Sequence, residues 1–350
     1  MAGLRCRKFL TICAVDCHVL VTDLFWPASA GNEPYRGLAL PALETLLARG
    51  TRVRTAGSSL ERWLAGRYRL PEGLPLAPFS LRGDGGEPGA DWWMRADPVH
   101  LKVHGDRLIL ADAARLAVTA GESRDFVAAL NLHFAGDGIS FVAPCPQRWY
   151  VRTAAEARLR TTPTAEATGR NVDALLPQGE DGAHWRKVIN EAQMLLHQHP
   201  CNEAREQQGR LAVNSVWIWG SGRARTLTAV YDALWTDHPV AAGLAAASGA
   251  AAWPLPPSGA ALLESGRGGT HLVVLPLPAT AYGDLAEWRA AAAMLERSWI
   301  AVLLEGLRDA VVESLTLHGL GPDHGYTSVL VKRDRLRLWR TRRPLRAYAA

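Results

Sequence analysis

The segment at residues 197–222 holds the densest group of side chains in this sequence that could bind an anion. Asn202 and Arg205 follow a predicted helix end, and Asn214 and Ser215 begin a predicted strand that ends at a Gly-Ser-Gly turn. A guanidinium, two carboxamides and the backbone N–H groups of such a turn are donors that suit a phosphate or a carboxylate. We therefore expect a site for a small phosphorylated or carboxylic acid at Asn202, Arg205, Asn214, Ser215, Gly220, Ser221 and Gly222.

A purely structural interpretation of the same residues stays open. Asn202 could cap a short helix, and Asn214 could satisfy the backbone of a loop. Arg205 could form an ion pair with Glu191 or Glu203. The two interpretations differ in what a substitution of Arg205 changes, which is ligand affinity in the first and stability in the second.

The histidines and cysteines do not have the spacing of a metal site. His197 and His199 are two residues apart and cannot share a helix face. Asp323-His324 lies in a Gly-rich stretch, and Asp97 and Asp137 each neighbour Pro or Gly, which favours turns. The five cysteines include no CxxC pair, so neither a disulfide framework nor a four-cysteine zinc site is indicated. We expect no metal, no cofactor and a reducing, cytoplasmic location.

Longer motifs resemble one protein family. Residues 93–101 read Trp-Met-Arg-Ala-Asp-Pro-Val-His-Leu, residues 131–138 read Asn-Leu-His-Phe-Ala-Gly-Asp-Gly, and residues 144–150 read Pro-Cys-Pro-Gln-Arg-Trp-Tyr. With residues 171–179 and 185–222, they are similar to the RpfE-type regulatory proteins, whose members are often labelled cofactor-independent phosphoglycerate mutase. The spacing from His199-Pro200 to Gly222 also resembles archaeal-type mutases of the alkaline-phosphatase-like superfamily.

The resemblance implies a specific chemistry, which the sequence matches only in part. The mutases use two divalent metals held by Asp and His residues and a Ser that takes the phosphoryl group. Asp16 lies where the first metal-binding Asp is expected, but no Asp-Gly follows the first predicted strand. A late Asp-His pair is present at Asp323-His324. The resemblance thus favours a catalytically degenerate relative with a regulatory or small-anion-sensing role. The alternatives are an active metal-dependent mutase or phosphotransferase and a nucleic-acid-binding regulator.

Hydrophobic periodicity predicts the elements that would position these residues. A buried strand is expected at residues 9–15, a helix at residues 41–49 and another from Ser58 or Ser59 to Tyr68, followed by a loop over residues 71–89. Hairpins are predicted around residues 105 and 145, and helices at residues 122–134, 181–199, 241–252 and 284–309. Further strands are predicted at residues 213–219, 226–231, 271–275, 315–317 and 329–331. This is an α/β protein with a mixed sheet and helices packed on it, which could be a degenerate alkaline-phosphatase-like fold. We place an N-terminal lobe at residues 1–165 and a C-terminal lobe with a basic tail at residues 166–346.

The net charge of +5 is concentrated near the C-terminus. Residues 332–346 contain eight basic residues and one acid, so the remainder of the chain is slightly acidic. Alternating Arg and Leu favour a solvated edge strand, where charge deters aggregation, over a nucleic-acid surface. No apolar run reaches the roughly 18 residues of a membrane span, so no membrane partner is expected.

Overall fold

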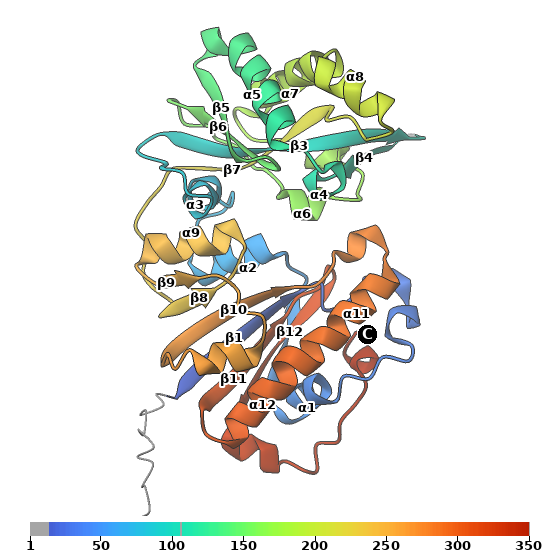
Figure 1. Ribbon diagram of the computed structural model, residues 1–350, viewed down its shortest axis with the longest axis vertical. Coiled ribbons are helices and arrows are strands. Elements are labelled where there is room, and N and C mark those ends of the chain that lie inside the picture. Colours follow the sequence, from blue (N-terminus) through green and yellow to red (C-terminus); the bar gives the residue numbers. More distant parts are fainter. Residues whose placement is uncertain (1–13, 106, 350) are drawn as a thin grey trace, which may run out of the picture. The chain divides into compact units, whose positions relative to one another are not determined.

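The chain forms two compact units, seen in a computed structural model that describes residues 14–105 and 107–349 (Figure 1). Unit 1 comprises Met1–Ser58, Tyr231–Trp235 and Trp253–Ala350. Unit 2 comprises Ser59–Val230 and Thr236–Ala252. Unit 1 therefore combines segments of both predicted lobes. The boundary between the units does not coincide with the lobe boundary predicted at residue 165.

Unit 1 is built on a seven-stranded mixed sheet with the strand order β2-β12-β11-β1-β10-β8-β9. The central strand β1 (Val15–Thr22) runs parallel to β10 (Gly269–Pro276) and to β11 (Val312–Gly319). Antiparallel to β11 runs β12 (His324–Val331), which pairs in turn with the edge strand β2 (Thr51–Ala56). The short strands β8 (Ala233–Trp235) and β9 (Ala251–Trp253) complete the other side. The mixed-sheet α/β fold predicted from the sequence is confirmed.

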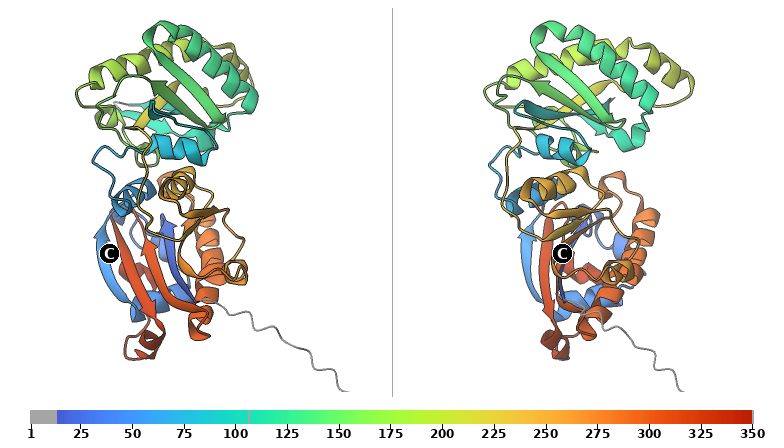
Figure 2. Two further views of the ribbon diagram at one scale, coloured as in Figure 1. Left: turned by 90° about the vertical axis from the view of Figure 1, so that its left-hand side faces the viewer. Right: turned by 60° about the vertical axis from the view of Figure 1, so that its left-hand side comes forward.

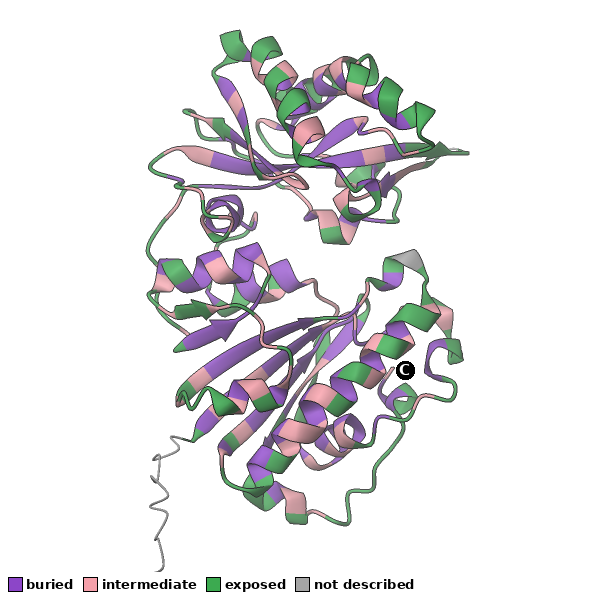
Figure 3. Cartoon of the chain, viewed as in Figure 1, coloured by how far each residue is buried: buried purple, intermediate pink, exposed green. Residues whose placement is uncertain are grey.

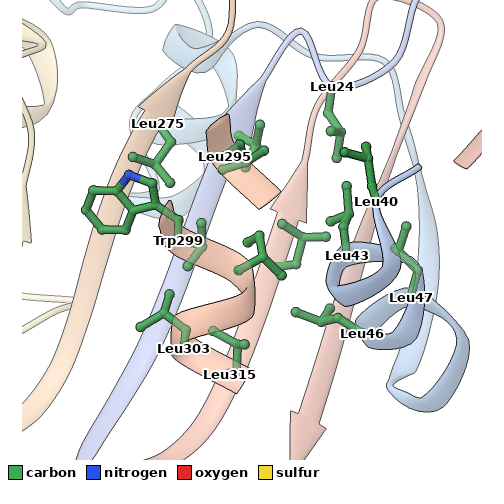
Figure 4. Packing of buried hydrophobic residues seen from close by; sticks show 14 of the residues in the cluster. Leu24, Leu40, Leu43, Leu46, Leu47, Leu275, Leu295, Trp299, Leu303 and Leu315 are labelled. Atoms are coloured by element: carbon green, nitrogen blue, oxygen red, sulfur yellow. The ribbon is translucent and has the colours of Figure 1, made fainter. Parts of the chain in front are cut away.

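A layer of helices covers one face of this sheet (Figures 1 and 2). It consists of α1 (Pro41–Arg49), α11 (Leu285–Leu295) and α12 (Ala301–Arg308), and a π-helical turn, Glu296–Ile300, joins the last two. Leucines of α1 pack with Trp299, Leu303 and Leu315 in the core (Figure 4). Glu296 also accepts hydrogen bonds from the backbone N–H groups of Ala42 and Leu43 at 2.6 and 3.0 Å. Its carboxylate caps α1, whose own N-cap residue has no polar side chain.

Unit 2 is built on a five-stranded antiparallel sheet. Its long strand β3 (Trp92–His104) pairs with β4 (Arg107–Ala111), β6 (Arg148–Thr153) and β7 (Ser215–Gly222), and β5 (Ile139–Cys145) pairs with β6. The helices α5 (Ala120–His133) and α7 (Gly182–His197) pack on one face through an apolar core. On the other face, α3 (Ala77–Gly83) contacts Trp93 and Tyr150. Buried positions of this unit lie both on the sheet strands and on the helix faces that pack against them (Figure 3).

Shorter helices complete the two units. Those in unit 2 are α2 (Leu60–Arg67), α4 (Ala113–Leu116), α6 (Thr164–Ala167), α8 (Pro200–Gln207) and α9 (Pro239–Ser248), and unit 1 adds α10 (Gly259–Glu264). No helix within residues 14–105 and 107–349 is long and apolar enough to cross a membrane.

Several local predictions need correction. Most of the strand expected at residues 9–15 lies outside the described residues, and the described strand begins at Val15. The predicted loop at residues 71–89 contains α3, and residues 226–231 are irregular rather than a strand. The basic tail is not an edge strand. It forms the 3-10 helices Lys332–Leu336 and Leu345–Tyr348 joined by irregular chain, and the edges of the unit 1 sheet are β2 and β9.

Candidate functional site

The carboxyl ends of the parallel strands of unit 1 bring together polar groups from distant parts of the chain. Ligands of open α/β sheets bind at such edges. Asp23 follows β1, and its Oδ1 atom accepts hydrogen bonds from the backbone N–H and the hydroxyl of Thr280, both at 3.1 Å. Thr280 lies just beyond β10. The carboxylate of Asp23 thereby joins the chain that follows β1 to the chain that follows β10.

Asp23 has an uncommon environment. Its φ is 51°, in the left-handed region that few non-glycine residues adopt. Its backbone oxygen accepts a hydrogen bond from the indole N–H of Trp288 at 2.8 Å. Burial raises the pKa of the Asp23 carboxyl, and the bonds from Thr280 oppose that shift. Such a strained residue at a strand end is a reasonable place to look for function.

The turn between β11 and β12 contributes a second carboxylate to this edge. Asp323 accepts a hydrogen bond from the backbone N–H of Ala28 through Oδ2 at 2.7 Å, and its backbone oxygen accepts one from Gly57 at 3.2 Å. A Cβ atom at Gly57 would lie only 1.9 Å from the backbone oxygen of Pro322, so this close approach requires glycine. His324 is buried, with Nε2 2.8 Å from the backbone oxygen of Tyr348.

These groups do not fit the two-metal site that the resemblance implies. Within residues 14–105 and 107–349, no three His, Cys, Asp or Glu side chains converge as a metal site would require. The expectation for Asp16 was wrong. Asp16 is the second residue of β1, at the opposite edge of the sheet, where Ser314 donates a hydrogen bond to it. Asp23 is the acid that follows the first strand.

In the sequence-predicted site, Arg205 is engaged by the protein itself. The side chain is 1% exposed. Its Nε and Nη2 atoms donate to the backbone oxygens of Leu211 and Leu116 at 2.8 and 2.6 Å, and Nη1 donates to Glu122 at 3.0 Å. The ion-pair partner is therefore Glu122 of α5, rather than Glu191 or Glu203.

Glu122 is held in its charged form by this arrangement. Although partial burial acts to raise it, hydrogen bonds from the Thr119 backbone and from Arg210 hold the pKa of the Glu122 carboxyl below its ordinary value. Thr119 and Glu122 also form a capping box at the start of α5. Arg205 thus ties α8 to the N-terminus of α5.

The carboxamides of the predicted site also bind backbone groups. Asn202 donates to the oxygens of Leu196 and Val213 and accepts from the N–H of Val213, all at 2.7 to 2.8 Å. Asn214 pairs with both backbone groups of Leu101. The cap of α8 is His199, whose Nδ1 accepts from Cys201, rather than Asn202.

The remaining predicted site residues lie within strand β7. Ser215 begins the strand, where its hydroxyl accepts a hydrogen bond from Gln193 at 3.1 Å. Gly220, Ser221 and Gly222 are its last three residues and are buried, although a loop was expected. Gly220 has a φ of +77°, and its N–H donates to the Thr161 hydroxyl at 3.1 Å. Asn202 and Arg205 thus lie together in α8. The Gly-Ser-Gly residues bind residues 157–161, so they do not form one pocket with Arg205 through these contacts.

A buried charged cluster in unit 2 escaped the sequence analysis. Asp97 was expected in a turn, but it lies within β3 and is buried. It accepts hydrogen bonds from Arg95, from the Thr164 hydroxyl at 2.6 Å and from the Trp219 indole at 2.8 Å. Arg95 also donates to Ser80 at 2.7 Å. The one available signal was the Trp-Met-Arg-Ala-Asp motif, which places both charges on a strand.

A groove of about 610 Å³ opens on unit 2. It is lined by α2, by residues 70–74 and 160–162 and by residues 174–178, and its charged side chains are Arg62, Arg160 and Glu72. Arg62 is bound to Glu166 at 2.6 Å, whereas the contact of the Arg160 guanidinium with Gln178 is long, at 3.5 Å. The volume is typical of a small-molecule site.

Comparisons with known proteins agree with part of the resemblance. A Methanosarcina mazei 2,3-bisphosphoglycerate-independent phosphoglycerate mutase is 37% identical over 73 residues, which are 21% of this chain and 18% of that protein. A probable enzyme of the same name from Geobacter sulfurreducens is 24% identical over 158 residues, 45% of this chain and 40% of that protein. This chain is partly similar to phosphoglycerate mutases.

The similarity covers less than half of either protein. The aligned regions span 18% and 40% of the lengths of those two relatives. No family model matches the chain. The PH0037 protein of Pyrococcus horikoshii has a similar fold, with a TM-score of 0.55 and 14% identity over 91% of this chain and 88% of that one. This phosphoglycerate-mutase-like chain therefore has the fold of the Pyrococcus protein over most of its length. Its sequence similarity to the phosphoglycerate mutases covers a smaller part.

Proposed function

We propose that this phosphoglycerate-mutase-like chain is a catalytically degenerate relative of the RpfE type, with a regulatory or small-anion-sensing role in the cytoplasm. A degenerate alkaline-phosphatase-like fold is the corresponding structural proposal. The observation that carries it is the set of contacts at the carboxyl edge of the unit 1 sheet. There one oxygen of Asp23 accepts hydrogen bonds from Thr280 and one oxygen of Asp323 accepts one from Ala28, so protein donors compete with metal ions for these carboxylates.

Metal binding and mutase activity test the degenerate character. Purified protein would be titrated with Mn²⁺ and Zn²⁺ by calorimetry and assayed on 3-phosphoglycerate with each metal. We expect no stoichiometric binding and no 2-phosphoglycerate. About two equivalents of bound metal together with turnover would establish the alternative, an active metal-dependent mutase. Asp23→Ala should then abolish both, which would distinguish a real site from a contaminating enzyme.

For the anion we propose the groove at Arg62 and Arg160. Of the sequence-predicted residues, Gly220 of β7 contacts the wall of this groove. Gly220 holds Thr161 through a hydrogen bond at 3.1 Å, and the Trp217 indole donates to the backbone oxygen of Thr162 at 2.8 Å. Both threonines line the groove. Strand β7 would thus support the wall, while the exposed guanidinium of Arg160 would contact a phosphate or carboxylate.

Two arginine variants separate binding from structural support. Binding of 3-phosphoglycerate would be measured by calorimetry for Arg160→Gln and for Arg205→Lys. We expect Arg160→Gln to weaken binding about tenfold or more, as loss of a charge-assisted contact of ~1.5 kcal/mol implies. Arg205→Lys should leave the affinity of the folded protein unchanged. If Arg205→Lys weakened binding and Arg160→Gln did not, the ligand site would lie at Arg205 and the proposed groove would be wrong.

A further inference from the structure

The basic C-terminal segment of unit 1, residues 332–346, is folded against α1 and the start of β2. Arg49 donates to the backbone oxygen of Arg335 at 3.0 Å, and Arg337 donates back to that of Arg49 at 3.2 Å. Arg340 donates to the backbone oxygen of Gly50 at 2.9 Å. These bonds hold the backbone of the segment in place. Each bond uses one N–H donor of a guanidinium that carries five, so further donors are left for a ligand. The segment is therefore an ordered basic surface.

The positive charge of this surface is poorly compensated. Arg337 pairs with Asp334 at 2.8 Å and Arg342 with Glu44 at 3.6 Å. Of the remaining basic residues in this region, Arg52, Arg340 and Arg343 have no ion-pair partner in the described part of the chain. Three converging guanidiniums without acids repel one another unless an anion lies between them. The region is suited to a ligand with several negative charges.

These three arginines line one groove together with aromatic rings. The groove has a volume of about 490 Å³ and is bordered by Arg52, Arg340, Arg343, Trp339 and Tyr348. The guanidinium of Arg52 lies over the Tyr348 ring, 5.2 Å from its centre. Trp339 is 76% exposed, although tryptophan is usually among the more buried residues. An exposed indole beside arginines is a combination that stacks bases while phosphates are bound.

We propose that this groove and the adjoining basic segment bind single-stranded nucleic acid. Arg52, Arg340 and Arg343 contact consecutive phosphates, and Trp339 stacks on a base. Leu336 and Leu338, which are also exposed, extend the apolar border of the surface. The inference is independent of the proposed anion sensing, since it rests on unit 1 residues that the groove of unit 2 does not share.

Fluorescence anisotropy with a labelled oligothymidylate of about 12 nucleotides tests the proposal, because single-strand sites span ~4–16 nucleotides. Binding should weaken steeply between 50 and 200 mM salt, by roughly tenfold or more if three phosphates are neutralised. Arg340→Gln with Arg343→Gln should reduce affinity about tenfold or more. Trp339→Ala should also weaken binding, and quenching of tryptophan fluorescence by the oligonucleotide should decrease in that variant.

A matched control removes the same charge elsewhere. Arg124 and Arg225 are exposed residues of unit 2, so Arg124→Gln with Arg225→Gln lowers the net charge equally without touching the groove. The control should bind within about twofold of the wild type. Equal losses in both double variants, no binding at low salt, or stronger binding to phosphatidylglycerol vesicles than to the oligonucleotide would each overturn the proposal. Arg343→Gln alone should also weaken binding, because Arg343 lines the groove.

Discussion

At the scale of single residues, the position of Arg205 decides how its chemistry is used. Its charge would suit an anion, yet three of its nitrogen atoms already bind Leu211, Leu116 and Glu122. A buried guanidinium with such partners is costly to replace, because each group left behind loses its hydrogen bond in a dry environment. Arg205 therefore links helices α8 and α5 in addition to any role near a ligand.

The expected effect of Arg205→Lys follows from those bonds. A lysine cannot reach both carbonyl oxygens and the carboxylate, so we expect unfolding free energy to fall by about 2 to 4 kcal/mol. Urea denaturation followed by circular dichroism measures the loss. Arg124→Lys, at an exposed position of α5, is the control and should change stability by less than about 0.5 kcal/mol. If Arg205→Lys also lowered stability by less than about 0.5 kcal/mol, the structural role of Arg205 would be contradicted.

Asp23 gives a prediction about pH. Its pKa is raised by burial, so the folded protein binds this proton more tightly than the unfolded chain does. Its contribution to stability therefore decreases as the pH rises from the ordinary value of 3.8 through the raised pKa. Asp23→Asn should remove that decrease, because asparagine stays neutral and also tolerates positive φ. Denaturation curves of both proteins across this pH range measure the difference, and parallel pH profiles would contradict it.

At the scale of elements, the long helical run of residues 285–308 was predicted from its apolar periodicity. The sequence pattern did not predict the π turn. Glu296 at its start binds the N-terminus of α1, more than 250 residues earlier, which is a contact that local periodicity does not reveal. A π turn inserts one extra residue and shifts the face that follows. Trp299 lies in the turn and is 6% exposed.

Substitution of Trp299 tests the packing of this helix. Trp299→Ala should lower the unfolding free energy by about 3 to 5 kcal/mol, because it leaves a cavity in the core of unit 1. Met294 lies five residues earlier on the same run and is 59% exposed. Met294→Ala should therefore cost less than about 0.5 kcal/mol. If Trp299→Ala and Met294→Ala lowered stability by similar amounts in thermal or urea denaturation, the helix would not pack on the sheet through Trp299 as described.

Local signals predicted the helices and hairpins better than the connections between them. The Pro41 start and the Ser59 cap were visible because each acts within a few residues. Helix α3 was missed because its Pro- and Gly-rich surroundings suggested a loop, whereas its burial depends on contacts with β3, β6 and the later helix α9. Glu122 was not predicted as the partner of Arg205 because this contact, too, joins distant parts of the sequence. That carboxylate is 83 residues away from Arg205 along the chain.

At the scale of the whole molecule, the composition of the units predicts which fragments fold. Unit 2 lies within residues 59–252, a range that also contains the unit 1 segment Tyr231–Trp235, whereas unit 1 needs three separated segments. We expect a fragment of residues 59–252 to unfold cooperatively on heating and to give a dispersed NMR spectrum. A fragment of residues 1–165, which matches the predicted N-terminal lobe, should show neither. Cooperative melting of the latter alone would favour the boundary at residue 165.

The central strand β1 has a consequence for how the protein is made. Its neighbours on either side are β10 and β11, so Val15 must wait for Gly269 and Val312 to be synthesised. A ribosome that adds ~5–20 residues per second needs roughly 15 to 60 seconds to proceed from Val15 to Val312. Throughout this time the apolar residues of β1 remain without their partners, and such strands are prone to aggregation. The newly synthesised N-terminal segment is therefore a natural client of ribosome-associated chaperones, and its yield in the cell should depend on them more than that of the locally assembled unit 2.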